Sequence, residues 1–282
     1  MGIRKGFIVL PFLAALLGVL AACLPQPDEP VEYLQQPDSI TIQIRVVDLS
    51  ASDLEQRLAV PEFTLYGDGT LIYTTERAPS RLLQTKLPDD AVRELLEFIV
   101  DAGFLNFSYR QPEPDWRDRQ PTTFIYAHTL ALANAVSAYA VDTNLPPNAG
   151  DEWDQCRALR EIAERLRAVD PVALGGSKPV EFVPEAIVLQ VRSFGEPPYE
   201  GDPDFVSANE INLAEIVPLG SAPTEHLVEG QLAGELWGNF GAVSNGHVPP
   251  VVSPIEQGDR NFLIRFLPIL PYEENFPEFD IQ

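Results

Sequence analysis

A turn between two short apolar runs decides the fold class of this chain: Glu62-Phe-Thr-Leu-Tyr-Gly-Asp-Gly-Thr-Leu-Ile-Tyr-Thr74. The Asp-Gly step at Asp68 and Gly69 is a strong signal for a tight β-hairpin, because both residue types tolerate the backbone conformations that such turns need. The flanking runs are rich in the aromatic and β-branched residues typical of strands. The sequence therefore predicts an antiparallel sheet built around this hairpin.

Further strands are expected on both sides of the hairpin. Isoleucine and valine alternate with other residues from Ile40 to Val47, and this period of two is typical of a half-buried strand. A third strand is expected over 81–87. Another antiparallel pair is expected over 122–128 and 135–141, with His128 at the end of its first strand as a structural histidine.

Two amphipathic helices complete this first unit. Pro88 precedes Asp89 and Asp90, and these carboxylates suit the positive end of a helix dipole. We favour this role at a helix N-terminus over an acid/base pair. An apolar stripe of period 3.6 follows and ends at Gly103. A second helix is predicted over 151–168, with Cys156 on its apolar face. The fold class is therefore α+β, an antiparallel sheet with two packed helices.

The remainder of the chain predicts a second, smaller and loop-rich α+β unit. Its expected elements are strands over 186–192 and 261–267, a weaker strand over 211–217 and a short helix over 230–240 that contains Trp237. The expected organisation is, in order, a signal peptide over 1–22, a proline-rich tether over 23–38, an α+β domain over 39–170, a linker over 171–184, a small α+β domain over 185–270 and an acidic aromatic tail over 271–282.

The charge of the chain excludes several classes of function. There are 42 acidic and 19 basic residues among 282, for a net charge of −23, while 45% of the residues are hydrophobic. A nucleic-acid partner is excluded because phosphate neutralisation requires a basic surface. A basic grip on anionic lipid headgroups is excluded for the same reason. The hydrophobic content is that of a globular protein with an acidic surface.

The N-terminus has the features of a secretory signal. Arg4 and Lys5 precede a charge-free apolar run that ends in Leu20-Ala21-Ala22-Cys23. This tetrapeptide resembles the lipobox of bacterial lipoproteins. The resemblance implies that the Cys23 thiol receives a diacylglyceryl group, that the chain is cleaved before Cys23, and that no disulfide can form with the remaining Cys156. Two or more acyl chains hold a protein stably at a membrane.

An uncleaved membrane-spanning anchor is the alternative, since Phe7 to Leu24 carries no charge. Both interpretations place the body outside the cytoplasm, at the cell membrane or the outer membrane. The region from Ile40 to Val169, with its Gly-Asp-Gly hairpin, Leu-rich helix and Thr-Thr-Phe-Ile-Tyr strand, resembles a domain of uncharacterised bacterial surface lipoproteins. That resemblance brings no activity with it.

Motifs for catalysis are sparse. The sequence contains no Gly-x-Ser-x-Gly elbow, no Walker loop, no Gly-x-Gly-x-x-Gly cradle and no His-Glu-x-x-His. His226 and Glu229 stand at helical spacing, but Gly230 follows where a second histidine would be needed for zinc. We therefore assign no catalytic residue, cofactor or metal site.

One acidic loop is a candidate ligand site. Glu113, Asp115 and Asp118 lie around Trp116, and carboxylates beside an indole could line a carbohydrate site. A solvated acidic loop is the favoured interpretation. The expected function is a non-catalytic binding or envelope-assembly module with an envelope protein or glycan as partner, and the alternative is a glycan-directed envelope hydrolase that uses these carboxylates.

Overall fold

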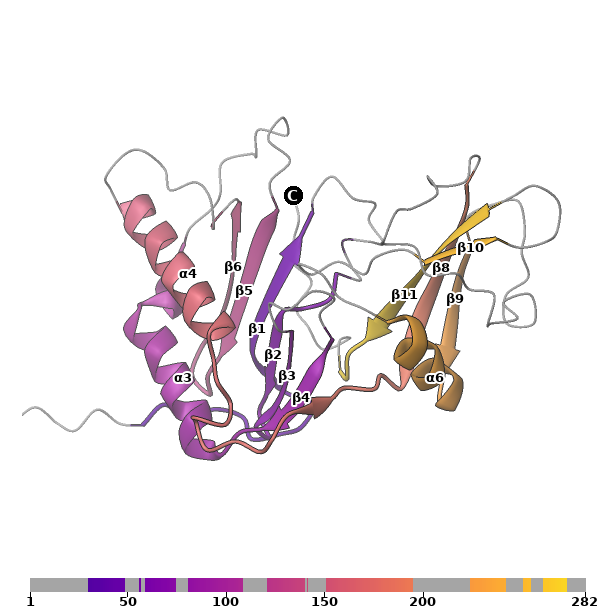
Figure 1. The fold of residues 1–282 in the computed structure, drawn as a ribbon. Helices are drawn as coiled ribbons and strands as arrows, with labels where there is room; N and C mark the ends of the chain where they lie inside the picture. The colour runs from indigo at the N-terminus through magenta and orange to yellow at the C-terminus, as the bar shows by residue number, and fades with distance from the viewer. Residues whose placement is uncertain are drawn as a thin grey trace, which may run out of the picture. The chain divides into compact units, whose positions relative to one another are not determined.

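The computed structural model describes residues 30–48, 56, 59–74, 81–108, 121–139, 141, 151–194, 224–241, 251–254 and 261–272. Two antiparallel sheets and their associated helices make up this part of the chain (Figure 1). Cys23, the acidic loop around Trp116 and the weak strand expected over 211–217 lie outside the described residues. The α+β class predicted from the sequence is confirmed.

The larger sheet has seven strands in the order β6-β5-β1-β2-β3-β4-β7. Their bounds are β1 Ile40–Val47, β2 Phe63–Tyr66, β3 Thr70–Tyr73, β4 Leu83–Lys86, β5 Thr122–His128, β6 Ala133–Tyr139 and β7 Val180–Glu181. The predicted hairpin is confirmed, because Leu65 pairs with Leu71 across its turn. Strand β6 begins two residues before the expected start. Strand β7 was not predicted; it lies in the expected linker and pairs with β4.

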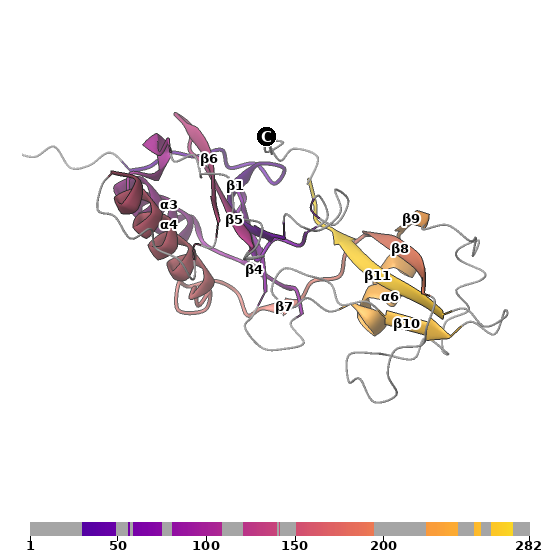
Figure 2. The same cartoon turned by 90° about the horizontal axis from the view of Figure 1, so that it is seen from above.

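Two helices lie side by side along one face of this sheet, as both views show: α3 (Asp89–Asp101) and α4 (Asp151–Arg167) (Figures 1 and 2). Both helices were predicted. Pro88 is the N-cap of α3, and Gly103 after its end has a φ of +79°, a conformation that favours glycine. The short 3₁₀ helix η1 (Phe104–Asn106) follows.

The smaller sheet has four strands in the order β10-β11-β8-β9. Its elements are β8 Ala186–Phe194, β9 Thr224–Glu229, helix α6 Gln231–Phe240, β10 Val251–Pro254 and β11 Asn261–Ile269. Strands β9 and β10 were not predicted. His226 and Glu229 lie on β9, so the helical spacing assumed for them is wrong. Residues three apart on a strand point to opposite faces, since strand side chains alternate.

Strand β1 is buried on both faces, which corrects the half-buried strand expected from its alternation. Ile42 and Ile44 point to one face and Gln43 and Arg45 to the other, and all four are buried. The alternation therefore identifies the strand, but the face that contains Gln43 and Arg45 is covered by other parts of the protein, whereas solvent was expected there. A buried polar side chain needs hydrogen-bond partners, and Gln43 Nε2 donates to Thr64 Oγ1 at 3.2 Å.

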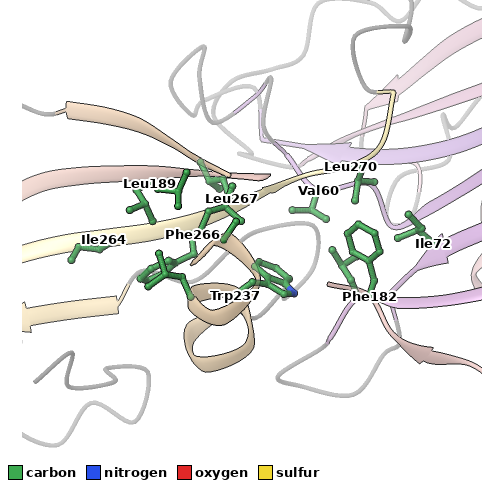
Figure 3. Close-up of a cluster of buried hydrophobic side chains, with 14 of the residues drawn as sticks. Val60, Ile72, Phe182, Leu189, Trp237, Ile264, Phe266, Leu267 and Leu270 are labelled. Atoms are coloured by element: carbon green, nitrogen blue, oxygen red, sulfur yellow. The ribbon is translucent and has the colours of Figure 1, made fainter. Parts of the chain in front are cut away.

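One cluster of buried apolar side chains contains residues from both sheets (Figure 3). Trp237 of α6 and Phe266 of β11 belong to it together with Val60, Ile72 and Phe182. Trp237 is fully buried, as expected for a core residue. Phe182 lies in the segment expected as a linker. The division of the chain into two domains stays a prediction.

Candidate functional site

The candidate site is the end of the seven-stranded sheet where the N-terminal segment joins the fold. Residues 32–39, which we call the strap, lie against this end. Tyr33 is buried, and its hydroxyl donates to Asp89 Oδ1 at 2.8 Å. Gln35 Nε2 donates to Asp89 Oδ2 at 2.8 Å. Both carboxylate oxygens at the start of α3 are therefore bound by the strap.

The environment of Tyr33 follows from this contact. Burial, together with the hydrogen bond to Asp89 and its negative charge, raises the pKa of Tyr33 to about 12. The Arg93 guanidinium lies over the Tyr33 ring, 5.6 Å from its centroid. Asp89 is thus a helix N-terminal residue that fixes the strap, consistent with the interpretation preferred from sequence over an acid/base pair.

The turn between β2 and β3 holds the other end of the strap. Gly67 N donates to Ser39 O at 2.7 Å. A Cβ atom on Gly67 would lie 1.8 Å from Leu34 O, so only glycine allows this approach. Beside it, burial opposes ionisation of Asp68, but hydrogen bonds from Lys86 and Thr70 prevail and lower its pKa. The predicted Gly-Asp-Gly turn therefore has a second role, as a seat for the strap.

The hairpin between β5 and β6 contacts the strap from a third side. Leu130 N donates to Glu32 O at 2.8 Å. Thr129 closes the turn, since its N donates to Leu132 O at 2.8 Å and its Oγ1 accepts from Leu132 N at 3.1 Å. Leu130 and Leu132 nevertheless remain 57% and 53% exposed. The point where the chain enters the fold is therefore next to two exposed leucines.

The residues selected from sequence fall mostly outside the described part of the chain. Cys23 lies outside the described residues, and so do the four members of the acidic loop, Glu113, Asp115, Trp116 and Asp118. Lipidation and the carbohydrate site therefore stay predictions. Cys156 is buried on α4, as expected for a cysteine that packs as a small apolar residue.

The two described histidines do not share a site. His128 ends β5, and its ring centroid lies 6.2 Å from that of Tyr126. His226 lies on β9 opposite Leu189, with a buried Nε2. In the described ranges no group of three or more His, Cys, Asp and Glu side chains could hold a metal ion. The helices of the described segments include none long and apolar enough to cross a membrane.

Sequence reasoning missed both the strap and the exposed leucines. A signal for the hairpin was present: 121–141 contains no Asp, Glu, Lys or Arg in a chain of net charge −23. Tyr33, an aromatic residue in a polar proline-rich segment, was the corresponding signal for the strap. Comparisons of the chain with protein families, with curated proteins and with solved structures found no match.

Proposed function

We propose that this chain is a lipoprotein, held at the cell membrane or the outer membrane by lipid on Cys23, with its α+β body outside the cytoplasm. The sequence Leu20-Ala21-Ala22-Cys23 after a charge-free apolar run supports the anchor. The body acts as a non-catalytic binding or envelope-assembly module, whose partner is an envelope protein or a glycan.

The short stretch of chain between Cys23 and the strap supports a role close to the membrane. Glu32, whose carbonyl accepts from Leu130, follows Cys23 by nine positions. A fully extended chain spans about 3.3–3.6 Å per residue, so this stretch reaches at most about 32 Å. The predicted tether extends to residue 38, yet Tyr33 is already buried. A lipid on Cys23 would therefore keep the body close to the bilayer, at a place suited to envelope assembly.

A non-catalytic role agrees with how the described carboxylates are used. Asp89 binds Tyr33 and Gln35, while Asp68 binds Lys86 and Thr70. These contacts hold structural segments together. The glycan-directed hydrolase that uses the loop around Trp116 remains the alternative. It predicts glycan cleavage by the purified chain that Glu113→Gln, Asp115→Asn or Asp118→Asn abolishes.

Mass spectrometry of the protein from native membranes tests the anchor. We expect a mature chain that begins at an acylated Cys23, and we expect Cys23→Ser to accumulate as an uncleaved, unacylated chain. Cys156→Ser is the matched control, because it removes the other cysteine, which is buried on α4, and should leave processing unchanged. A full-length chain with an unmodified Cys23 would refute the proposal.

The binding role needs a separate test. Cross-linking in native envelopes, followed by identification of the captured proteins and glycans, should give a defined set of partners with the wild-type chain. The same set should be lost with Cys23→Ser if anchoring places the body near them. Capture that does not depend on Cys23 would show that the anchor plays no part in partner choice.

A further inference from the structure

The β5–β6 hairpin combines three features that the proposed function does not use. It exposes two leucines, it touches the strap, and the segment 121–141 that forms it contains no Asp, Glu, Lys or Arg. We propose that this hairpin is a second, non-covalent contact with the lipid bilayer, in which Leu130 and Leu132 enter the interfacial region. The proposal rests on the lipid anchor at Cys23.

The turn is built so that its leucines face outward. Thr129 is buried and bonds to Leu132 through its backbone N and its Oγ1. Leu130 N is engaged by Glu32 O. The backbone of the hairpin tip is therefore fixed by these contacts while both side chains stay exposed. An ordered backbone with apolar side chains outside allows those side chains to reach the boundary between headgroups and acyl chains.

The hairpin lacks the acidic side chains that would oppose its approach to a membrane. Anionic headgroups repel an acidic protein, and the chain has 42 acidic against 19 basic residues. From 121 to 141 there is no Asp, Glu, Lys or Arg. Edge strand β6 continues this surface with exposed Ala133 and Ala135. The hairpin can therefore approach headgroups without bringing a charge of its own.

The length of chain to the anchor places the bilayer within reach. Leu130 is hydrogen-bonded to Glu32, and Glu32 is at most about 32 Å of extended chain from Cys23. Two exposed leucines alone would bind a membrane weakly. Attachment through the lipid holds the hairpin next to the bilayer, so its binding takes place at an effective concentration on the order of millimolar, as for two sites joined by a short linker. The anchor and the hairpin therefore act as two linked contacts.

Fluorescence of the full acylated chain in vesicles tests the proposal. Leu132→Trp is compared with Leu227→Trp, which replaces an equally exposed leucine on β9 of the smaller sheet. Both proteins are reconstituted in phosphatidylcholine vesicles with and without brominated acyl chains, and the emission of the wild-type protein is subtracted. We expect the emission added by Leu132→Trp to shift to the blue and to lose most of its intensity to bromine. The emission added by Leu227→Trp should be unaffected.

The outcomes separate this proposal from the anchor itself. Mass spectrometry of the same samples reports acylation of Cys23, so an unmodified Cys23 defeats the proposed function. Acylated protein in which Leu132→Trp is not quenched, or is quenched no more than Leu227→Trp, overturns the hairpin contact alone. Leu130→Trp must behave as Leu132→Trp does. Shielding of the hairpin in native envelopes but not in lipid vesicles would identify a protein as its occupant and overturn the lipid assignment.

Discussion

Strand β1 of the larger sheet and strand β9 of the smaller sheet bury their residues in different ways. In the seven-stranded sheet, polar residues such as Gln43 and Thr64 are buried along with their apolar neighbours. In the four-stranded sheet, β9 leaves Leu227 58% exposed. Residue type and burial are thus uncoupled in opposite directions. A strand can therefore be recognised from its own sequence pattern, whereas its burial depends on the layers that the rest of the chain places against it.

A substitution at Trp237 tests whether the two sheets depend on one core. Trp237→Ala should lower the free energy of unfolding by about 3–5 kcal/mol, because a fully buried aromatic side chain is lost from a cluster with members in both sheets. Urea denaturation followed by circular dichroism measures it. Leu232→Ala on the exposed side of α6 is the control and should change the value by about 0.5 kcal/mol or less.

The shape of that unfolding curve carries further information. A single transition that shifts as a whole would mean that the sheets unfold together. If only part of the signal moved and a second transition kept its midpoint, the two sheets would be independent, as the predicted division into two domains requires.

Burial of polar groups in the larger sheet is tested by Thr64→Val. The substitution removes the acceptor for Gln43 Nε2 while Gln43 stays buried, so we expect a loss of about 1–3 kcal/mol. The double variant Gln43→Leu with Thr64→Val should recover much of this loss, because no buried amide is then left without its partner. Equal losses in the single and double variants would count against this explanation.

The strap gives a smaller effect. Asp89→Asn weakens the hydrogen bonds from Tyr33 and Gln35, and we expect a loss of about 1 kcal/mol relative to Asp90→Asn. Asp90 is the matched control because it also lies in the first turn of α3 and makes the same favourable interaction with the helix dipole. Hydrogen exchange should show faster exchange in residues 32–39 only for Asp89→Asn. Equal behaviour of the two variants would mean that the strap does not depend on Asp89.

Alkaline pH provides an independent measurement on Tyr33. Its pKa is about 12 in the folded protein against 10.0 for the free side chain, so the protonated form is favoured by folding. The stability that this contributes is complete below pH about 10 and is lost as pH rises toward 12. The advantage of the wild type over Tyr33→Phe should therefore narrow across this interval. If the difference in free energy of unfolding between the two proteins stayed constant from pH 9 to about pH 11 or higher, the assignment would be contradicted.

The smallest effect is expected at the exposed leucine of the smaller sheet. Leu227→Lys should change the free energy of unfolding by about 0.5 kcal/mol or less, since the side chain is mostly in solvent. Thermal unfolding measures it, with Val228→Ala on the same strand as the buried comparison. A large loss at Leu227 would mean that the exposed and buried faces of β9 have been interchanged.

Local patterns were sufficient for most of the larger sheet and its helices. Asp68-Gly69 identified the hairpin, and the Pro88-Asp89-Asp90 start with a 3.6-residue stripe identified α3. Strands β7, β9 and β10 were missed because they are short or polar and depend on pairing with distant partners. Val180 of β7, for example, pairs with Gln84. No periodicity within two residues can reveal such a pairing.

The candidate site was harder to predict for the same reason. Nothing close to Asp89 in the sequence shows that Tyr33 and Gln35 bind its carboxylate. The hydrogen bond between Glu32 and Leu130 likewise joins segments that lie far apart in the sequence. The lipoprotein anchor could be proposed from sequence because the pattern Leu20-Ala21-Ala22-Cys23 lies in adjacent residues alone, whereas the strap is defined by tertiary contacts.

The position of β1 between β2 and β5 has a consequence for how the chain folds. The N-terminal strand β1 is made first and β2 follows it closely. The partners of Val47 and Ile42 on the other side of β1 are Thr122 and Ala127 of β5, which are made much later. Until β5 is made, one hydrogen-bonding edge of an apolar strand has no native partner. Such an edge is a template for aggregation. The order of the strands therefore makes the arrival of residues 122–128 a step on which productive folding depends, and a chain truncated before β5 should aggregate.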